Sequence, residues 1–341
     1  MATKKAPPLR LAVNGFGRIG RLVARAVLED KKRGLRLVAI NSNAPPETLA
    51  HLLQYDSVHG RFPGVVAADG DALRVGRHRI EVFSRRNPRD IDWRRPGAEI
   101  VLECSGVHKT RASLGAHLAG GARRVLVSSP AAGAERTVVY GVNHGDIKRS
   151  ERVISCASCT TNCLAPLLVV LERNFGIERA FASAVHAYTS DQRLVDGSHR
   201  DSRRARAAGL SIIPTSSGLA EAVFRALPEF RGRLDGSAVR VPVANVSFLE
   251  VTATLARAVD VDSVNGVFVR ASRSAGLRGI LSVSEVPLVS ADFNHDSRSA
   301  VVDLHSTRVV DGCLVRVAAW YDNEWGFANR MVDLAVYLGR G

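Results

Sequence analysis

The sequence predicts an α/β domain built on a parallel sheet, followed by an α+β domain with a mixed or antiparallel sheet. In the first half of the chain, short apolar segments alternate with segments of helical periodicity. After about residue 158 the strand-like segments become longer, and apolar and polar residues alternate within them. Strand–helix–strand units require right-handed crossovers in a parallel sheet, whereas alternating strands suit a sheet with one face packed on helices.

The first half is expected to hold four short strands and two helices. The strands lie at residues 9–14, 35–41, 99–106 and 123–129. Residues 18–30 have helical spacing, and a second helical segment lies around 113–122. One face of the first helix would carry Ile19, Leu22, Val23, Ala26 and Val27.

The second half begins with a helix expected at 160–176 and ends with an amphipathic helix at 326–339. Long alternating strands are expected between them, at 178–189, 237–255 and 313–323. The polar loop at 189–211 is long, and loops of that size inside compact domains usually have a function.

The length of 341 residues allows two domains with cores of their own. We expect one domain from 1–158, completed by the last helix at 324–341, and another from 159–323. No signal peptide or membrane span is evident, so we expect a cytoplasmic protein whose cysteines are free thiols.

The chain is basic, with 47 Lys and Arg against 33 Asp and Glu and a net charge of +14. This excess suits an anionic partner, either a phosphorylated metabolite or nucleic acid. The excess is also explained by a composition that uses Arg for ordinary surface cations. We favour this second explanation for the excess as a whole.

The segment "NGFGRIG" places Gly15, Gly17 and Gly20 in the GxGxxG spacing. The pattern is weak alone, but here it follows a predicted strand and opens a predicted helix. Such glycines permit a tight turn, close approach of a pyrophosphate and packing of helix on strand, which predicts a Rossmann dinucleotide-binding domain.

The second predicted strand ends without the acidic residue that holds a ribose 2′-OH in NAD-preferring folds. Ser42 stands where that residue is expected, in "AINSNAPP". The sequence therefore leaves both NAD and NADP open at this point.

Three of the five cysteines, Cys156, Cys159 and Cys163, lie within "CASCTTNC". A structural zinc site needs four ligands, and no second cluster supplies them, so we expect no metal. The strand pattern also does not suit a thioredoxin-like pair. Cys159 precedes a helix, whose N-terminus stabilises a thiolate, and this favours a nucleophile.

A nucleophilic thiol needs a base, and His186 on the next strand is the candidate. Its apolar neighbours Val185 and Ala187 also suit a buried core histidine. Taken alone, this residue is better explained by packing.

Several motifs together resemble glyceraldehyde-3-phosphate dehydrogenases, in order from about residue 11 to 338. They are "NGFGRIGR", "YDSVHGRF", "ASCTTNC", "VHAYTSDQ", "RRARAA", "IIP", "RVPVANVS" and "WYDNEWGFANR". The cysteine motif and "YDNEWG" are highly specific.

The resemblance implies a thiolate at Cys159 that attacks the aldehyde of glyceraldehyde 3-phosphate. The thiohemiacetal would give hydride to the nicotinamide, and inorganic phosphate would release an acyl phosphate from the thioester. His186 would pair with the thiolate and then act as general base.

Two phosphate sites and a cofactor site are also implied by the resemblance. The substrate phosphate maps to Thr189, Asp191, Arg204 and Arg240, and the attacking phosphate maps to Ser158, Thr160, Ser217 and Gly218. The cofactor would be held by Gly15, Phe16, Gly17, Arg18, Ile19, Gly20, Asn41, Ser42, Arg86, Ser105, Gly106, Ser128, Gly197, Ser198 and Asn323. Asn323 would hold the nicotinamide carboxamide.

Three features favour NADP, or use of both cofactors, over strict NAD. Ser42 lacks the carboxylate that repels a 2′-phosphate, and Arg86 aligns with an arginine near the adenine ribose. Gly197 and Ser198 stand where NAD-specific members carry Leu-Pro. Asn41 or Asn43 could still hold a 2′-OH.

The chain also departs from the common family pattern. Cys156 replaces an Asn and is either inert, which we favour, or a resolving thiol for Cys159. Ser217 replaces Thr and keeps a hydroxyl, whereas Phe327 replaces Tyr and loses one.

Alternative functions stay open. Residues 287–296 resemble erythrose-4-phosphate dehydrogenase, although "TSSG" at 215–218 suits a phosphorylating enzyme. The run "RDSRRARAAG" at 201–210 could contact nucleic acid, but it lacks aromatic residues for stacking. The family implies a homotetramer, with the long loop near a neighbouring subunit's cofactor.

Overall fold

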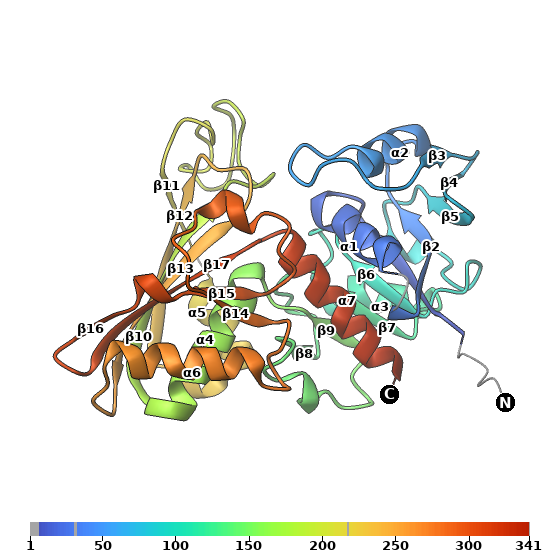
Figure 1. Cartoon of the computed structure of the whole chain (residues 1–341). Helices are drawn as coiled ribbons and strands as arrows, with labels where there is room; N and C mark the ends of the chain where they lie inside the picture. The colour runs from blue at the N-terminus through green and yellow to red at the C-terminus, as the bar shows by residue number, and fades with distance from the viewer. Residues whose placement is uncertain (1–6, 31–32, 217, 341) are drawn as a thin grey trace. The chain divides into compact units, whose positions relative to one another are not determined.

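The computed structural model describes residues 7–30, 33–216 and 218–340, which divide between two compact units (Figure 1). The first unit takes its residues from 1–138, 146–157 and 328–341, and the second from 139–145 and 158–327. Among the described residues, no helix combines the length and apolar character that a membrane span requires.

The first unit is built on a nine-stranded sheet, counted over the described residues, in the order β3-β4-β5-β2-β1-β6-β7-β9-β8. The strands are β1 (Leu9–Asn14), β2 (Leu35–Asn41), β3 (Val66–Ala68), β4 (Ala72–Val75), β5 (His78–Phe83), β6 (Ile100–Glu103), β7 (Arg124–Val127), β8 (Arg136–Thr137) and β9 (Val153–Ser155). From β5 to β8 all neighbours are parallel, and only the β3–β4–β5 edge is antiparallel. The predicted parallel sheet is confirmed.

The helices of this unit are α1 (Arg18–Glu29), α2 (Pro46–Gln54), α3 (Arg111–Ala119) and the later part of α7 (Trp325–Arg340). Helix α1 buries Leu22, Val23, Ala26 and Val27 on the predicted face, while Ile19 is half-buried. Sequence patterns did not indicate α2 or the antiparallel edge, because these elements are short.

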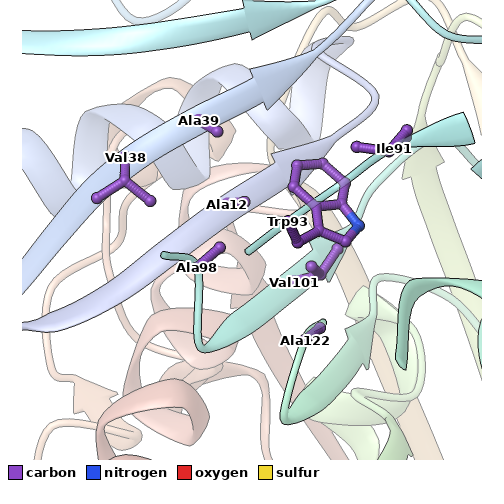
Figure 2. Close-up of a cluster of buried hydrophobic side chains, with 8 residues drawn as sticks. All are labelled: Ala12, Val38, Ala39, Ile91, Trp93, Ala98, Val101 and Ala122. Atoms are coloured by element: carbon purple, nitrogen blue, oxygen red, sulfur yellow. The ribbon is translucent and has the colours of Figure 1, made fainter. Parts of the chain in front are cut away.

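One apolar cluster of this unit surrounds Trp93, whose side chain is fully buried (Figure 2). Small side chains from β1 and β2, among them Ala12 and Ala39, make room for the indole. The cluster consists of Ala12, Val38, Ala39, Ile91, Trp93, Ala98, Val101 and Ala122.

A buried chain of hydrogen bonds links the last residues of three neighbouring strands. Asn41 Nδ2 of β2 donates to Asn14 Oδ1 of β1 at 2.7 Å, and Asn14 Nδ2 donates to Glu103 Oε2 of β6 at 2.5 Å. His117 Nε2 lies 3.0 Å from the same Glu103 oxygen. Trp93 Nε1 donates to His117 Nδ1 at 3.1 Å, so Nε2 must carry the hydrogen that Glu103 accepts. This chain holds the carboxyl ends of the strands, where ligands bind in open α/β sheets.

The second unit contains a mixed sheet of eight strands within the described residues, ordered β11-β12-β10-β13-β17-β15-β14, with β16 paired to β17. The strands are β10 (Ile177–Ala187), β11 (Ile213–Thr215), β12 (Leu234–Val241), β13 (Ser247–Leu255), β14 (Leu281–Ser284), β15 (Ala300–Asp303), β16 (Arg308–Val310) and β17 (Leu314–Tyr321). Its helices are α4 (Cys159–Phe175), α5 (Leu219–Ala226) and α6 (Val261–Arg273). The β10–β12 and β14–β15 pairs are parallel and the other pairs antiparallel, as a mixed sheet requires.

The prediction of one strand over 237–255 is wrong. The chain leaves the sheet after Val241 and re-enters it at Ser247, so that β12 and β13 lie on opposite sides of β10. Pro242 cannot donate to a ladder, and Val246 has a φ of +67°, which is not a strand conformation. The alternating pattern continues across this break and hides it.

Candidate active site

Cys159 is the first residue of α4, at the end of a tight turn from β9. Ala157 adopts a φ of +59°, which is uncommon for a residue with a side chain. Ser158 then caps the helix, because its hydroxyl accepts from Thr161 N at 3.1 Å. The thiol therefore lies where the helix dipole favours a negative charge.

His186 lies on β10 with its ring facing this thiol. Its Nε2 is 3.4 Å from Cys159 Sγ, and only 5% of the residue is exposed. His186 is therefore both a buried residue and a contact of the cysteine, so packing alone does not describe its surroundings.

Arg240, on β12, lies on the other side of the imidazole. Its Nη1 is 2.8 Å from His186 Nδ1 and donates to Ala187 O at 3.0 Å. The same Nδ1 is 2.7 Å from Ala187 O. A neutral imidazole nitrogen either donates or accepts. When Nδ1 donates to Ala187 O, Nε2 presents a lone pair to Cys159 and can take its proton.

Burial disfavours charge on both members of this pair. It raises the pKa of the Cys159 thiol, which the Arg240 guanidinium opposes. Burial, and then the charge of Arg240, lowers the pKa of His186 to about 3. A thiolate and an imidazolium in contact stabilise each other, so the two groups must exchange their proton as a pair.

Two residues that sequence patterns did not indicate join this group. Tyr321, on β17, is 2% exposed, and its hydroxyl is 3.0 Å from Thr160 Oγ1. Ser247, at the start of β13, donates to Asn323 Oδ1 at 2.8 Å and accepts from Ala187 N at 3.1 Å. "WYDN" and "NVS" carry no chemical signal of their own, so only the fold could have found them.

The predicted anion-binding residues form a second group in the same unit. Arg204 binds Asp191 Oδ2 through Nη1 and donates to Thr215 Oγ1 at 2.6 Å through Nη2. Thr189, by contrast, is held through its backbone by Gln192 Oε1. Thr215 was not among the predicted residues.

Arg204 and Arg240 are close enough to repel each other. Burial lowers the pKa of Arg240, and the Arg204 charge lowers it further. Arg240 Nε is buried and has no hydrogen-bond partner among the described residues. Two neighbouring guanidiniums with an unused buried donor suit an oxyanion such as phosphate.

The structure describes three of the four residues predicted for the attacking phosphate. Thr160 is next to the thiol, with its Oγ1 3.9 Å from Cys159 Sγ. Gly218 is the N-cap of α5, and Ser217 lies outside the described residues.

The glycine-rich turn of the first unit has the geometry of an anion cradle. Gly15 has a φ of +88°, and a Cβ there would lie 2.5 Å from Ser105 Cα. A Cβ on Gly20 would lie 2.1 Å from Gly15 O, whereas one on Gly17 would meet only open space. Gly17 is the N-cap of α1, and no described side chain caps its first turn. The residues present therefore fit a dinucleotide pyrophosphate.

Other predicted cofactor residues flank this turn. Phe16 is buried, Ile19 is half-buried, and Arg18 is anchored to Asp56 at 2.5 Å. Ser105 N donates to Glu103 Oε1 at 2.7 Å, and Gly106 is exposed with a φ of +73°. Ser128 directly follows β7 and is half-buried.

The residues expected near the adenine ribose are also in the first unit. Asn41 Nδ2 donates to Asn14 Oδ1 and to Arg85 O, and its Oδ1 accepts from Arg85 N. Both amide hydrogens are thus used within the protein. The Ser42 hydroxyl accepts a long 3.4 Å bond from Ala44 N. Arg86 is exposed and lines a hollow of about 480 Å³.

Gly197 and Ser198 belong to the exposed part of the 189–211 loop in the second unit. Ser198 O accepts from Arg193 Nε at 2.9 Å, and Gly197 N donates to Ala205 O. The run at 201–210 is part of the same folded loop, with Arg206 paired to Asp196.

Comparison with known families finds two matches. Residues 9–111 match the family described as glyceraldehyde 3-phosphate dehydrogenase, NAD binding domain, and residues 158–323 match its C-terminal domain. The matched segments correspond to the glycine-rich turn and to the cysteine–histidine site.

Curated relatives align over nearly the whole chain. The glyceraldehyde-3-phosphate dehydrogenase of Xanthobacter flavus is 50% identical over 97% of this chain and 99% of its own length. Those of Pseudomonas aeruginosa and Bacillus subtilis (its enzyme 1) are 51% and 46% identical, each over 97% of this chain and 98% of its own. These matches show that the chain belongs to the glyceraldehyde-3-phosphate dehydrogenase family.

Proposed function

We propose that this member of the family catalyses the reversible, phosphorylating oxidation of glyceraldehyde 3-phosphate to 1,3-bisphosphoglycerate. The observation that carries the proposal is the 3.4 Å contact between Cys159 Sγ and His186 Nε2 at the start of α4. Family membership supports an NAD(P)-dependent dehydrogenase, and the paired guanidiniums support a phosphorylated substrate.

In the proposed reaction, His186 Nε2 takes the proton of Cys159, and the thiolate forms a C–S bond to the aldehyde carbon while the C=O π bond opens. The His186 imidazolium returns the proton to the new oxyanion, which gives a thiohemiacetal and a neutral imidazole. His186 then accepts the hydroxyl proton as the C–H bond breaks and a thioester forms. When bound, the nicotinamide cofactor accepts the hydride. Inorganic phosphate attacks the thioester, the C–S bond breaks, and the acyl phosphate leaves with the thiolate regenerated.

The proposed roles of the remaining residues follow from their chemistry. Arg204, Arg240, Thr189 and Asp191 would form the substrate-phosphate site. Ser158, Thr160, Ser217 and Gly218 would receive the attacking phosphate. A guanidinium that can donate two parallel hydrogen bonds suits a phosphate better than a single ammonium would.

The cofactor proposal is NADP as the preferred cofactor, or use of both. The structure adds an argument to those from the sequence, because Asn41 has no amide hydrogen left to donate to a 2′-OH. Ser42 carries no negative charge and can donate its hydroxyl hydrogen, and Arg86 supplies a cation on the same unit. These groups favour a 2′-phosphate.

We also propose a cytoplasmic homotetramer. The 189–211 loop is internally bonded, for example through Ala208 N to Arg193 O, yet it exposes large apolar side chains. Leu194, Val195 and Leu210 are 87%, 72% and 86% exposed, and Ile212, directly after the loop, is 69% exposed. A folded loop that exposes such residues suits burial against another subunit. The five free thiols suit a reducing cytoplasm, which cell fractionation would test.

The first prediction concerns the nucleophile. Iodoacetate should alkylate Cys159 before Cys156 and Cys163, because these two are only 3% and 0% exposed and burial raises the pKa of Cys156 to about 12. Mass spectrometry of peptides after timed alkylation measures this. Cys159→Ser should abolish oxidation of the aldehyde, whereas Cys156→Ser should retain it. Substantial activity in Cys159→Ser would refute the role.

The second prediction separates the two arginines. Arg204→Ala should lower kcat/KM for glyceraldehyde 3-phosphate by about ten- to a hundred-and-fifty-fold, since a charged hydrogen-bond partner is worth about 1.5–3 kcal/mol. It should change little with unphosphorylated glyceraldehyde. Arg240→Ala should impair both substrates, because Arg240 also contacts His186 Nδ1. Equal losses on both aldehydes in Arg204→Ala would contradict a phosphate-binding role. The same assays with erythrose 4-phosphate test the alternative substrate.

The third prediction concerns the cofactor. In wild type, kcat/KM for NADP should equal or exceed that for NAD. Ser42→Asp should shift the ratio toward NAD by about tenfold or more, because a carboxylate repels a 2′-phosphate and binds a 2′-OH. Ser42→Ala serves as the control, since it removes the hydroxyl without adding charge. A wild type that prefers NAD more than tenfold, or an unchanged ratio in Ser42→Asp, would overturn the proposal.

The fourth prediction concerns assembly. Light scattering at micromolar concentration should give four times the chain mass. Leu194→Asp combined with Leu210→Asp should lower that mass, because buried charges destabilise an interface. Arg203→Asp, on an exposed residue of the same loop, is the control for added charge. A monomeric wild type would rule out the tetramer.

A further inference from the structure

Ser247 occupies the point where several buried groups of the second unit meet. The residue is 1% exposed and has one hydroxyl hydrogen and two lone pairs. Ala187 N donates to its Oγ at 3.1 Å, and the Oγ donates to Asn323 Oδ1 at 2.8 Å. Tyr321 lies opposite it in the β13–β17 pair.

These bonds have one consistent direction. Ser247 has a single hydrogen, and Asn323 Oδ1 accepts it. One of its two lone pairs accepts from Ala187 N. The Ser247 side chain therefore connects the backbone after His186 to the Asn323 oxygen.

The backbone before Ser247 is strained, and the strain has a structural consequence. Val246 has a φ of +67°, which is a strained conformation for a β-branched residue. Its side chain packs against Phe293 and Val301 in an apolar cluster. The next residue, Ser247, hydrogen-bonds Ala187 N and Asn323. The strained turn thus separates a packing residue from a polar one at the entrance to β13.

We propose that Ser247 is a positioning residue that sets the orientation of the Asn323 amide and anchors the backbone beside His186. Because Asn323 Oδ1 accepts from Ser247, the amide is held with its oxygen toward Ser247, and its Nδ2 hydrogens are available to an incoming group. Among the described residues the structure gives those hydrogens no acceptor, so they suit the carbonyl oxygen of a carboxamide. The proposal rests on the assignment of Asn323 to the nicotinamide.

The second part of the proposal concerns the base. Ser247 accepts from the N–H of the peptide that joins His186 to Ala187, and Ala187 O in turn contacts His186 Nδ1. Loss of the Ser247 hydroxyl frees that peptide and with it the imidazole. The Ser247 side chain therefore influences two positions at once. One is that of the nicotinamide, which accepts the hydride, and the other is that of His186, which accepts the proton.

The test compares ligands that differ only in the nicotinamide. Calorimetry on the full chain compares the affinity for NAD⁺ with that for ADP-ribose, and the affinity for NADP⁺ with that for 2′-phospho-ADP-ribose. Ser247→Ala should weaken the binding of NAD⁺ and NADP⁺ by about tenfold, because an Asn323 amide that is no longer oriented loses its hydrogen bond to the nicotinamide. Binding of the two ligands without nicotinamide should change less than twofold. In an Asn323→Ala background, Ser247→Ala should have no further effect on binding.

Alkylation provides a readout without cofactor. Ser247→Ala should slow the reaction of iodoacetamide with Cys159 several-fold and shift its pH profile, and this effect should persist in the Asn323→Ala background. Ser247→Thr, which keeps the hydroxyl, should restore both binding and alkylation. Ser284→Ala is the matched control, since it removes a buried hydroxyl that bonds only Val286.

The outcomes distinguish the proposal from its premise. Equal weakening of ligands with and without nicotinamide, or an undiminished effect of Ser247→Ala on binding in the Asn323→Ala background, would overturn the role in orienting the amide. An unchanged alkylation rate in Ser247→Ala would overturn the role beside His186. Failure of the Cys159→Ser experiment would refute the proposed function instead, and it would leave the binding comparison intact.

Discussion

The 3.4 Å contact between Cys159 Sγ and His186 Nε2 is the geometric requirement on which the arrangement of the second unit depends. A thiol and an imidazole react with each other only within a narrow range of distance, and neither side chain is long enough to correct a misplaced backbone. The cysteine must therefore begin a helix, and the histidine must lie on a strand whose neighbours hold it firmly. The left-handed conformation of Ala157 meets the first requirement, and the strands β12 and β13 on either side of β10 meet the second.

The break between β12 and β13 explains why the sheet has this form. An uninterrupted strand over 237–255 could have lain on only one side of β10. The interruption at Pro242–Val246 lets the same stretch of chain return on the other side, so that Arg240 and Ser247 approach His186 from opposite neighbours. Arg240 brings charge and Ser247 brings a neutral hydrogen bond. The strained Val246 is stabilised by its packing in an apolar cluster.

In both units, buried polar groups are linked by chains of hydrogen bonds. In the first, the chain from Trp93 through His117 and Glu103 to Asn14 and Asn41 leaves each group with a partner. In the second, the chain from Ala187 N through Ser247 ends on Asn323. A buried polar group without a partner is costly, so each chain fixes the orientation of its last amide. For Asn41 this uses its donors, and for Asn323 it leaves them available.

The sequence by itself determined the parallel sheet of the first unit, the glycine-rich turn and the family. These are local properties, because strand and helix periodicity, the GxGxxG spacing and the cysteine motif are each contained in a few consecutive residues. It also pointed to Cys159 and His186, although His186 taken alone was better explained as a core residue. Only the tertiary structure decided that Ser247, Tyr321 and Thr215 belong beside the predicted residues, that Asn41 has no donor to spare, and that 237–255 is two strands. Each of these depends on which segments become neighbours in space, and hydrogen bonds between residues 11 to 161 positions apart leave no pattern along the chain.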